Sequence, residues 1–126
     1  MRLYLVRHAE AAPGTPDELR TLTAEGREQA RRLGEQLRAD GVAPDAILTS
    51  PLLRARETAD ALGLGASEPD ERLAPGATAD DVRAAAAGRG ETVVVVGHEP
   101  DCGEVTLALT GETRKFAPAD VVALDL

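Results

Sequence analysis

The run Thr92 to Val96 constrains the fold most, because it places four consecutive valines directly before Gly97 and His98. An unbroken β-branched run of this length is typical of a strand that is buried on both faces of its sheet. Three shorter apolar runs predict further strands, at Leu3 to Val6, Ala46 to Thr49 and Val121 to Leu124. A sheet covered on both faces needs helices on both sides, which the segments between the runs must supply.

The intervals between these runs carry helix signals. Thr23 is expected to cap a helix that continues, with apolar residues at helical spacing, until Asp40 and Gly41 end it. Ser50 as N-cap and Pro51 as the first helical residue predict a second helix. Two more helices are expected, over Asp80 to Ala87 and from Glu99-Pro100 to Gly111, the latter with Leu107 and Leu109 on its buried side. The other segments predict a loop over Ala11 to Arg20, a short edge strand over Leu64 to Glu68 and a turn at Ala74-Pro75-Gly76.

Strands that alternate with helices predict a three-layer α/β/α sandwich around a mainly parallel sheet. A chain of 126 residues fits one domain, so residues 1–126 are assigned to a single unit with one core. In sheets of this class, ligands bind beyond the carboxyl ends of the strands. The residues directly after each strand are therefore the first candidates for a functional site.

Composition limits the partners and the compartment. The net charge of −8 disfavours nucleic acid and anionic membrane surfaces as partners. No apolar run approaches the roughly 20 residues that a membrane helix needs, and the N-terminal residues lack the apolar stretch of a signal peptide. Cys102 is the only cysteine, so no internal disulfide can form, and it is expected to be a small buried or helix-face residue. These features together predict a cytoplasmic protein.

The only two histidines, His8 and His98, each follow the apolar run of a predicted strand. Either one alone fits an ordinary strand-end residue equally well. Because both follow a strand, both are expected at the same rim of the sheet, which is the edge where α/β proteins bind ligands. Two such placements are harder to explain as ordinary strand-end residues than one.

Two arginines are expected at this rim as well. Arg7 directly precedes His8, and Arg54 lies in the opening turn of the predicted second helix, rotated away from the buried stripe that contains Leu52. An ion pair with Glu57 on the next turn is the alternative role for Arg54. Because the N-terminus of a helix favours a bound anion, we interpret Arg54 as a phosphate-binding residue.

Two imidazoles and two guanidiniums around one point suit a phosphoryl group. Arginine offers paired donors to phosphate oxygens, and a neutral imidazole can attack phosphorus. Positive charge from Arg7 and Arg54 is expected to lower the pKa of His8 and keep its ring unprotonated. Neither a P-loop nor the loop of a cysteine-based phosphatase is present. A metal site built from the two histidines with Glu10 or Glu99 stays open as an alternative, although the adjacent arginine disfavours a cation.

Three separated motifs resemble those of the histidine phosphatase superfamily, which also contains the phosphoglycerate mutases, and within it the short SixA-type phosphohistidine phosphatases. The motifs are Arg7-His8-Ala9-Glu10, Ser50-Pro51-Leu52-Leu53-Arg54-Ala55-Arg56-Glu57-Thr58 and Val96-Gly97-His98-Glu99-Pro100, with Leu22-Thr23-Ala24-Glu25-Gly26 as a further match to the short branch. The resemblance covers nearly the whole chain and implies a phosphoglycerate mutase-like fold. One departure is Ala9, where glycine is usual, although its backbone carbonyl remains available to orient the His8 ring.

The resemblance implies a phosphatase in which His8 becomes phosphorylated and water then hydrolyses the phosphohistidine. By the same resemblance, Arg7 and Arg54 would bind the phosphoryl oxygens and His98 would hydrogen-bond the transferring group. No metal and no organic cofactor are implied.

The larger members of the family carry an acid on an inserted segment, whereas only Glu68 to Gly76 spans the equivalent region here. Asp70 or Glu71 would be the proton donor, unless the chain has none. Without a strong donor, substrates with good leaving groups are favoured, and this points to phosphohistidine in a phosphorylated protein. A small phosphate ester hydrolysed by the same mechanism and a non-catalytic phosphate-binding module are the alternatives.

Overall fold

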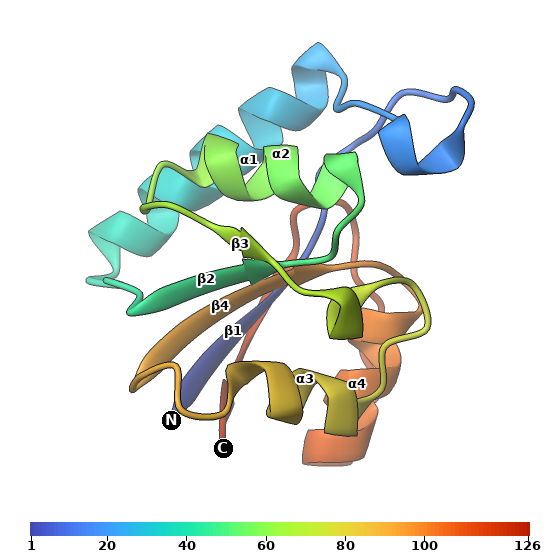
Figure 1. The fold of residues 1–126 in the computed structure, drawn as a ribbon. Helices are drawn as coiled ribbons and strands as arrows, with labels where there is room; N and C mark the ends of the chain where they lie inside the picture. The colour runs from blue at the N-terminus through green and yellow to red at the C-terminus, as the bar shows by residue number, and fades with distance from the viewer.

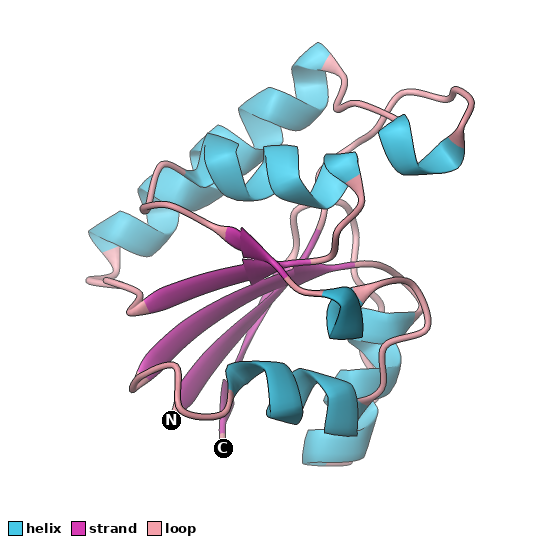
Figure 2. Cartoon of the chain, viewed as in Figure 1, coloured by secondary structure: helices cyan, strands magenta, loops and turns pink.

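The computed structural model describes residues 1–126 and contains one five-stranded sheet with the strand order β3-β2-β4-β1-β5. The strands are β1 (Arg2–Arg7), β2 (Ala46–Thr49), β3 (Glu68–Pro69), β4 (Thr92–Gly97) and β5 (Val121–Asp125). The helices are α1 (Ala24–Ala39), α2 (Leu53–Leu62), α3 (Ala79–Ala86) and α4 (Asp101–Thr110), with short 3-10 turns η1 (Asp17–Leu19) and η2 (Glu71–Leu73). Helices α1 and α2 cover one face of the sheet, and α3 and α4 cover the other (Figures 1 and 2).

The valine-rich strand β4 is the centre of the sheet. It pairs in parallel with β1 on one side and with β2 on the other, while β5 joins β1 in the antiparallel direction. The three-layer sandwich with a mainly parallel sheet is therefore confirmed. The carboxyl ends of β1, β2 and β4 meet at one edge, which is where a ligand is expected to bind.

The consecutive valines of β4 divide between two cores because successive side chains of a strand point to opposite faces. Val93 and Val95 pack toward α3 and α4. Val94 and Val96 pack under α2. Full burial of each such side chain contributes about 1.5 to 3 kcal/mol, so this strand is a main source of the stability of the sandwich.

Glycines let α1 approach its neighbours closely. A Cβ at Gly34 would overlap the carbonyl oxygen of Leu62 in α2, and a Cβ at Gly26 would overlap the carbonyl oxygen of Glu10. The second contact holds the start of α1 against the segment that follows β1. The ends of the loop over Ala11 to Arg20 are joined by an isolated β-bridge between Ala11 and Leu22.

Several element predictions need correction. Ser50 is not the N-cap of α2, because the helix begins two residues after Pro51 and Leu52 is the capping residue. The edge strand is Glu68–Pro69 rather than Leu64 to Glu68. Leu107 is 47% exposed and does not help to bury α4.

Other predictions hold. Thr23 caps α1 by accepting a hydrogen bond from the backbone N–H of Gly26, and Asp40 and Gly41 end the helix. Cys102 is buried in the core beneath α4, and burial raises the pKa of its thiol. None of the helices combines the length and the apolar character that a membrane crossing demands.

Candidate active site

The two histidines lie beside each other at the carboxyl ends of β1 and β4. The backbone N–H of His8 donates to the carbonyl oxygen of Gly97 at 2.9 Å, which extends the pairing of the two strands by one residue. The ring centroids of His8 and His98 are 5.3 Å apart, with the ring planes inclined by 61°. The strand-end rule therefore placed both side chains at the same rim correctly.

A hydrogen bond determines which nitrogen of His8 is free. Nδ1 lies 2.7 Å from the backbone oxygen of Ala9. A carbonyl oxygen can only accept, so Nδ1 carries the proton and the lone pair of the neutral ring is on Nε2. Ala9 is itself fixed, since it is fully buried and its N–H donates to Oγ1 of Thr58 at 3.0 Å.

His98 is held from the other side by a serine. Its Nε2 lies 2.7 Å from Oγ of Ser50, the first residue after β2. The same Oγ accepts a hydrogen bond from the backbone N–H of Leu52 at 3.2 Å, so its own proton is available for Nε2. In that arrangement Nδ1 of His98 carries the proton, and this buried nitrogen has no partner in the protein.

Both rings are neutral at physiological pH. Burial lowers the pKa of His8 to about 4, and the charges of Arg54, Arg7 and Arg20 add to the decrease. Burial also lowers the pKa of His98 to about 4, with smaller contributions from His8 and from the arginines. The predicted decrease for His8 is thus present, although burial contributes more than the positive charges on which the prediction rested.

The two arginines are anchored in the same way. Arg7 donates from Nη1 to the backbone oxygen of Phe116 at 2.8 Å, and Arg54 donates from Nη1 to the backbone oxygen of Asp17 at 2.9 Å. In both side chains Nε is buried and has no partner. The alternative ion pair between Arg54 and Glu57 does not form.

Glu57 has a structural role instead. One of its carboxylate oxygens accepts the backbone N–H of Leu22 at 2.8 Å, which ties the start of α1 to α2. Arg54 is therefore not paired with Glu57, and its side chain is only 8% exposed.

Sequence reasoning missed two charged residues of the loop before α1. Asp17 pairs with Arg54 through Oδ2, at 3.2 Å from Nη2. Its other oxygen, Oδ1, lies 3.2 Å from Nη1 of Arg20, whose Nε donates to the carbonyl oxygen of Ala12. The three-residue spacing of Asp17 and Arg20 was the available signal, but the prolines and glycine of the loop concealed its local helical turn.

All buried side-chain nitrogen and oxygen atoms without a partner belong to residues at the carboxyl ends of β1, β2 and β4 or to the first turn of α2. They are Nε of Arg7, Oγ1 of Thr49, Nε of Arg54 and Nδ1 of His98. Leaving such groups unpaired is costly, about 1 to 3 kcal/mol each. Three of the four are nitrogen donors of two guanidiniums and an imidazole, the groups that suit a phosphate anion.

The acidic residues considered from the sequence have other contacts. Asp70 accepts three hydrogen bonds from Arg72, and these keep the pKa of its carboxyl below the usual value, so it is a poor proton donor. Glu71 opens η2 and is exposed. Glu10 accepts from Thr23, and Glu99 accepts from the backbone at positions 103 and 116. No three His, Cys, Asp or Glu side chains are grouped so that they could hold a metal ion.

Comparison with known proteins agrees with this geometry. Residues 3–75 match the family model of the histidine phosphatase superfamily, branch 1. A protein from Picosynechococcus sp. is 33% identical, with 98% of this chain and 84% of the relative covered. The protein histidine phosphatase SixA in complex with tungstate has a TM-score of 0.90 at 26% identity, covering 100% of this chain and 88% of that one. A SixA structure from Agrobacterium tumefaciens has a TM-score of 0.85 at 26% identity, covering 98% and 90%.

The chain therefore belongs to the histidine phosphatase superfamily, and its fold is that of the phosphoglycerate mutase-like proteins. Its structural neighbours include SixA phosphohistidine phosphatases. The sequence resemblance to this family is thus confirmed.

Proposed function

We propose that this chain is a phosphatase that works through a phosphohistidine formed at Nε2 of His8. The observation that carries the proposal is the orientation of this ring, in which Nδ1 donates to the backbone oxygen of Ala9 and leaves the Nε2 lone pair free. The pKa of about 4 keeps that lone pair unprotonated at neutral pH. A nucleophilic imidazole needs both conditions.

The reaction proceeds in two displacements. First, Nε2 of His8 attacks phosphorus, a P–N bond forms, and the bond from phosphorus to the leaving group breaks. Arg7 and Arg54 neutralise the phosphoryl oxygens, and Nδ1–H of His98 donates to the transferring group. Then water attacks phosphorus and loses a proton to solvent, the electrons of the P–N bond return to Nε2, and inorganic phosphate departs.

The substrate that we propose is phosphohistidine in a phosphorylated protein. A phosphorylated imidazole that is protonated on its second nitrogen leaves as neutral imidazole, so the enzyme does not have to supply a proton. The state of Asp70 supports this choice, because its carboxylate is engaged by Arg72. The likeness to SixA phosphohistidine phosphatases supports it as well.

The setting that we propose is the cytoplasm, with catalysis independent of metal ions and with neither nucleic acid nor membrane as partner. The net charge of −8 supports the exclusion of polyanions. The single, buried cysteine is compatible with a reducing compartment.

A substrate panel tests the proposal. Phosphate release is measured from a phosphohistidine-containing protein and from sugar and nucleotide monophosphates, with and without a chelator, for the wild type and for His8→Ala. We expect the phosphoprotein to be hydrolysed with the highest kcat/KM, no effect of the chelator, and no activity in the variant.

The panel also separates the alternatives. A preference for small esters by orders of magnitude would replace the protein substrate with a small phosphate ester. Binding of phosphate without turnover of any member would identify a non-catalytic phosphate-binding module. Loss of activity in the chelator would point to a metal hydrolase.

A further inference from the structure

The two rim arginines differ in one respect that concerns how an anion binds. A guanidinium presents Nε–H and one Nη2–H along one edge, and this edge matches two oxygens of a phosphate. In Arg7 this edge is free, because the backbone contact to Phe116 uses only Nη1. In Arg54 half of the edge is taken, because Nη2 already contacts the Asp17 carboxylate at 3.2 Å.

The carboxylate of Asp17 lies between two guanidiniums, with Oδ2 on Arg54 and Oδ1 on Arg20. A phosphoryl group can be held in a similar way, because it also offers two oxygens that two arginines can bind. In Figure 1 the turn η1, which contains Asp17, lies beside the N-terminal end of α2, where Arg54 is located. Asp17 therefore occupies one of the two donors along the phosphate-binding edge of Arg54, while the other, Nε, stays unpaired.

Displacement of this carboxylate is structurally simple. The side chain of Asp17 is 62% exposed, so it can rotate into solvent. Arg54 keeps its anchor when this happens, because Nη1 is held by the backbone oxygen of Asp17 rather than by its side chain. The site can thus exchange one anion for another without reorganising the arginine.

We infer that Asp17 is a built-in competitor of the substrate, whose carboxylate must leave Nη2 of Arg54 before a phosphoryl group can bind both donors along that edge of the guanidinium. This inference rests on the proposed phosphoryl site and adds a residue that sets its affinity. Competition of this kind weakens the binding of inorganic phosphate and so promotes release of the product.

The test is the affinity for inorganic phosphate, measured by calorimetric titration at neutral pH. Asp17→Asn keeps the size of the side chain and the backbone anchor of Arg54 but removes the competing charge. Glu18→Gln is the matched control, because it removes the same charge from the next residue of η1, which is exposed. We expect phosphate to bind about tenfold more tightly to Asp17→Asn and within about twofold of wild type to the control.

A second readout is inhibition of turnover by phosphate. The inhibition constant is expected to fall in Asp17→Asn in parallel with the dissociation constant. If Asp17→Asn does not fold, Asp17→Ser removes the same carboxylate and is measured in its place.

The outcomes separate this inference from the proposed function. If phosphate binds the wild type but Asp17→Asn binds it no more tightly than Glu18→Gln does, the competition is refuted and the phosphatase proposal stands. Weaker binding in Asp17→Asn refutes it too, because the carboxylate would then help to hold the anion. If neither the wild type nor Asp17→Asn binds phosphate, and phosphate does not inhibit turnover, the competition is refuted; if in addition the wild type hydrolyses no member of the substrate panel, the proposed function is overturned as well.

Discussion

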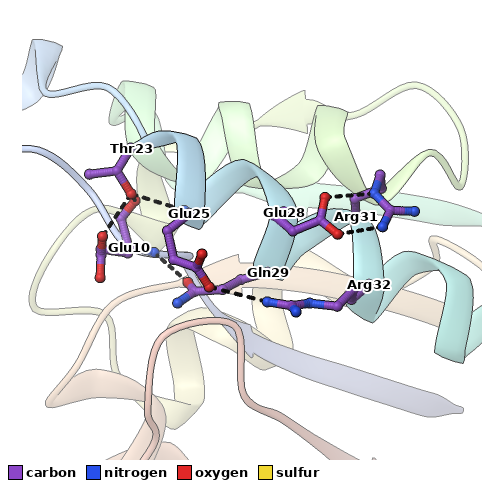
Figure 3. Close-up of polar contacts among 8 residues, drawn as sticks. Glu10, Thr23, Glu25, Glu28, Gln29, Arg31 and Arg32 are labelled. Carbon is purple, nitrogen blue, oxygen red and sulfur yellow. Dashed lines mark hydrogen bonds and ion pairs between the residues drawn. The ribbon is translucent and has the colours of Figure 1, made fainter.

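The outward face of α1 and the carboxyl-end rim of the sheet both concentrate charged side chains, but they use them differently. On α1, Arg31 pairs with Glu28 and Arg32 with Glu25 (Figure 3). Arg31 also pairs with Glu35 on the next turn. These side chains are between 43% and 60% exposed. At the rim, Arg54 is 8% exposed and retains a donor without a partner.

The difference shows that the number of charges does not identify a functional site. An exposed ion pair adds about 0 to 1 kcal/mol to stability and is weakened further by salt. A buried cation with an unused donor costs free energy in the folded state and recovers it when an anion arrives. Burial combined with unsatisfied hydrogen bonding is therefore the property that distinguishes the rim from the helix face.

The largest expected effect compares one arginine from each region. Arg54→Ala removes a guanidinium from the transferring group and is expected to lower kcat/KM by about 10³-fold. Arg31→Ala removes an equally charged side chain from α1 and is expected to change kcat/KM by less than about twofold. Steady-state kinetics on the same phosphoprotein substrate measures both. Similar losses in the two variants would remove the basis for separating the regions.

The second effect is the pH dependence of stability. In the folded protein His8 and His98 titrate near pH 4, whereas an unfolded histidine titrates near 6.5. The unfolded chain then binds more protons between these values, so the free energy of unfolding falls as the pH is lowered from 6.5 to 4. The loss is on the order of 3 kcal/mol for each ring, and below this range the two rings cause no further loss.

Denaturant unfolding at a series of pH values measures this slope. His8→Gln and His98→Gln should each reduce it. A slope that persists when both histidines are replaced would mean that other groups cause it.

The third effect concerns the hydroxyl that holds His98. Ser50→Ala removes the group that lies 2.7 Å from Nε2, so the ring loses the contact that fixes its orientation and its tautomer. We expect kcat/KM to fall by about tenfold, mainly through kcat. Thr106→Ala is the control, because it removes another buried hydroxyl, one that donates to a backbone oxygen within α4. Equal kinetic losses in the two variants would assign Ser50 a purely structural role.

The smallest effect is on the helix face itself. Arg31→Ala breaks the two ion pairs that Arg31 makes on α1 and is expected to lower the midpoint of thermal unfolding only slightly at low salt and by less at high salt. Thermal unfolding at two ionic strengths measures this. A large decrease that persists at high salt would show that exposed pairs contribute here as much as buried contacts do.

Much of the fold could be predicted because local pattern and tertiary structure agree. The valines of β4 are apolar whichever face they point to, so their run predicts a strand covered on both sides. His8, His98 and Arg54 were found because each follows a strand or opens a helix at the ligand-binding edge of the sheet. The positions of these three residues follow from the order of the elements along the chain and from the direction of the parallel strands, and both can be predicted from the sequence pattern.

The remainder depends on contacts between distant residues. Ser50 has the sequence signal of a helix cap, yet its hydroxyl contacts His98, 48 positions away, and α2 begins later. Asp17 is separated from Arg54 by 37 positions and lies in a loop without periodicity. No local rule relates residues so far apart, so these two parts of the site become visible only in three dimensions.

Trapping the phosphoenzyme shows directly whether His8 is the nucleophile. Wild-type protein is mixed with saturating phosphoprotein substrate and denatured within milliseconds at alkaline pH, where phosphohistidine survives, and the modified atom is then located by mass spectrometry and phosphorus NMR. We expect a phosphoryl group on Nε2 of His8 and none in His8→Ala. A phosphoryl group on another residue, or turnover by His8→Ala at the wild-type rate, would exclude His8 as the nucleophile.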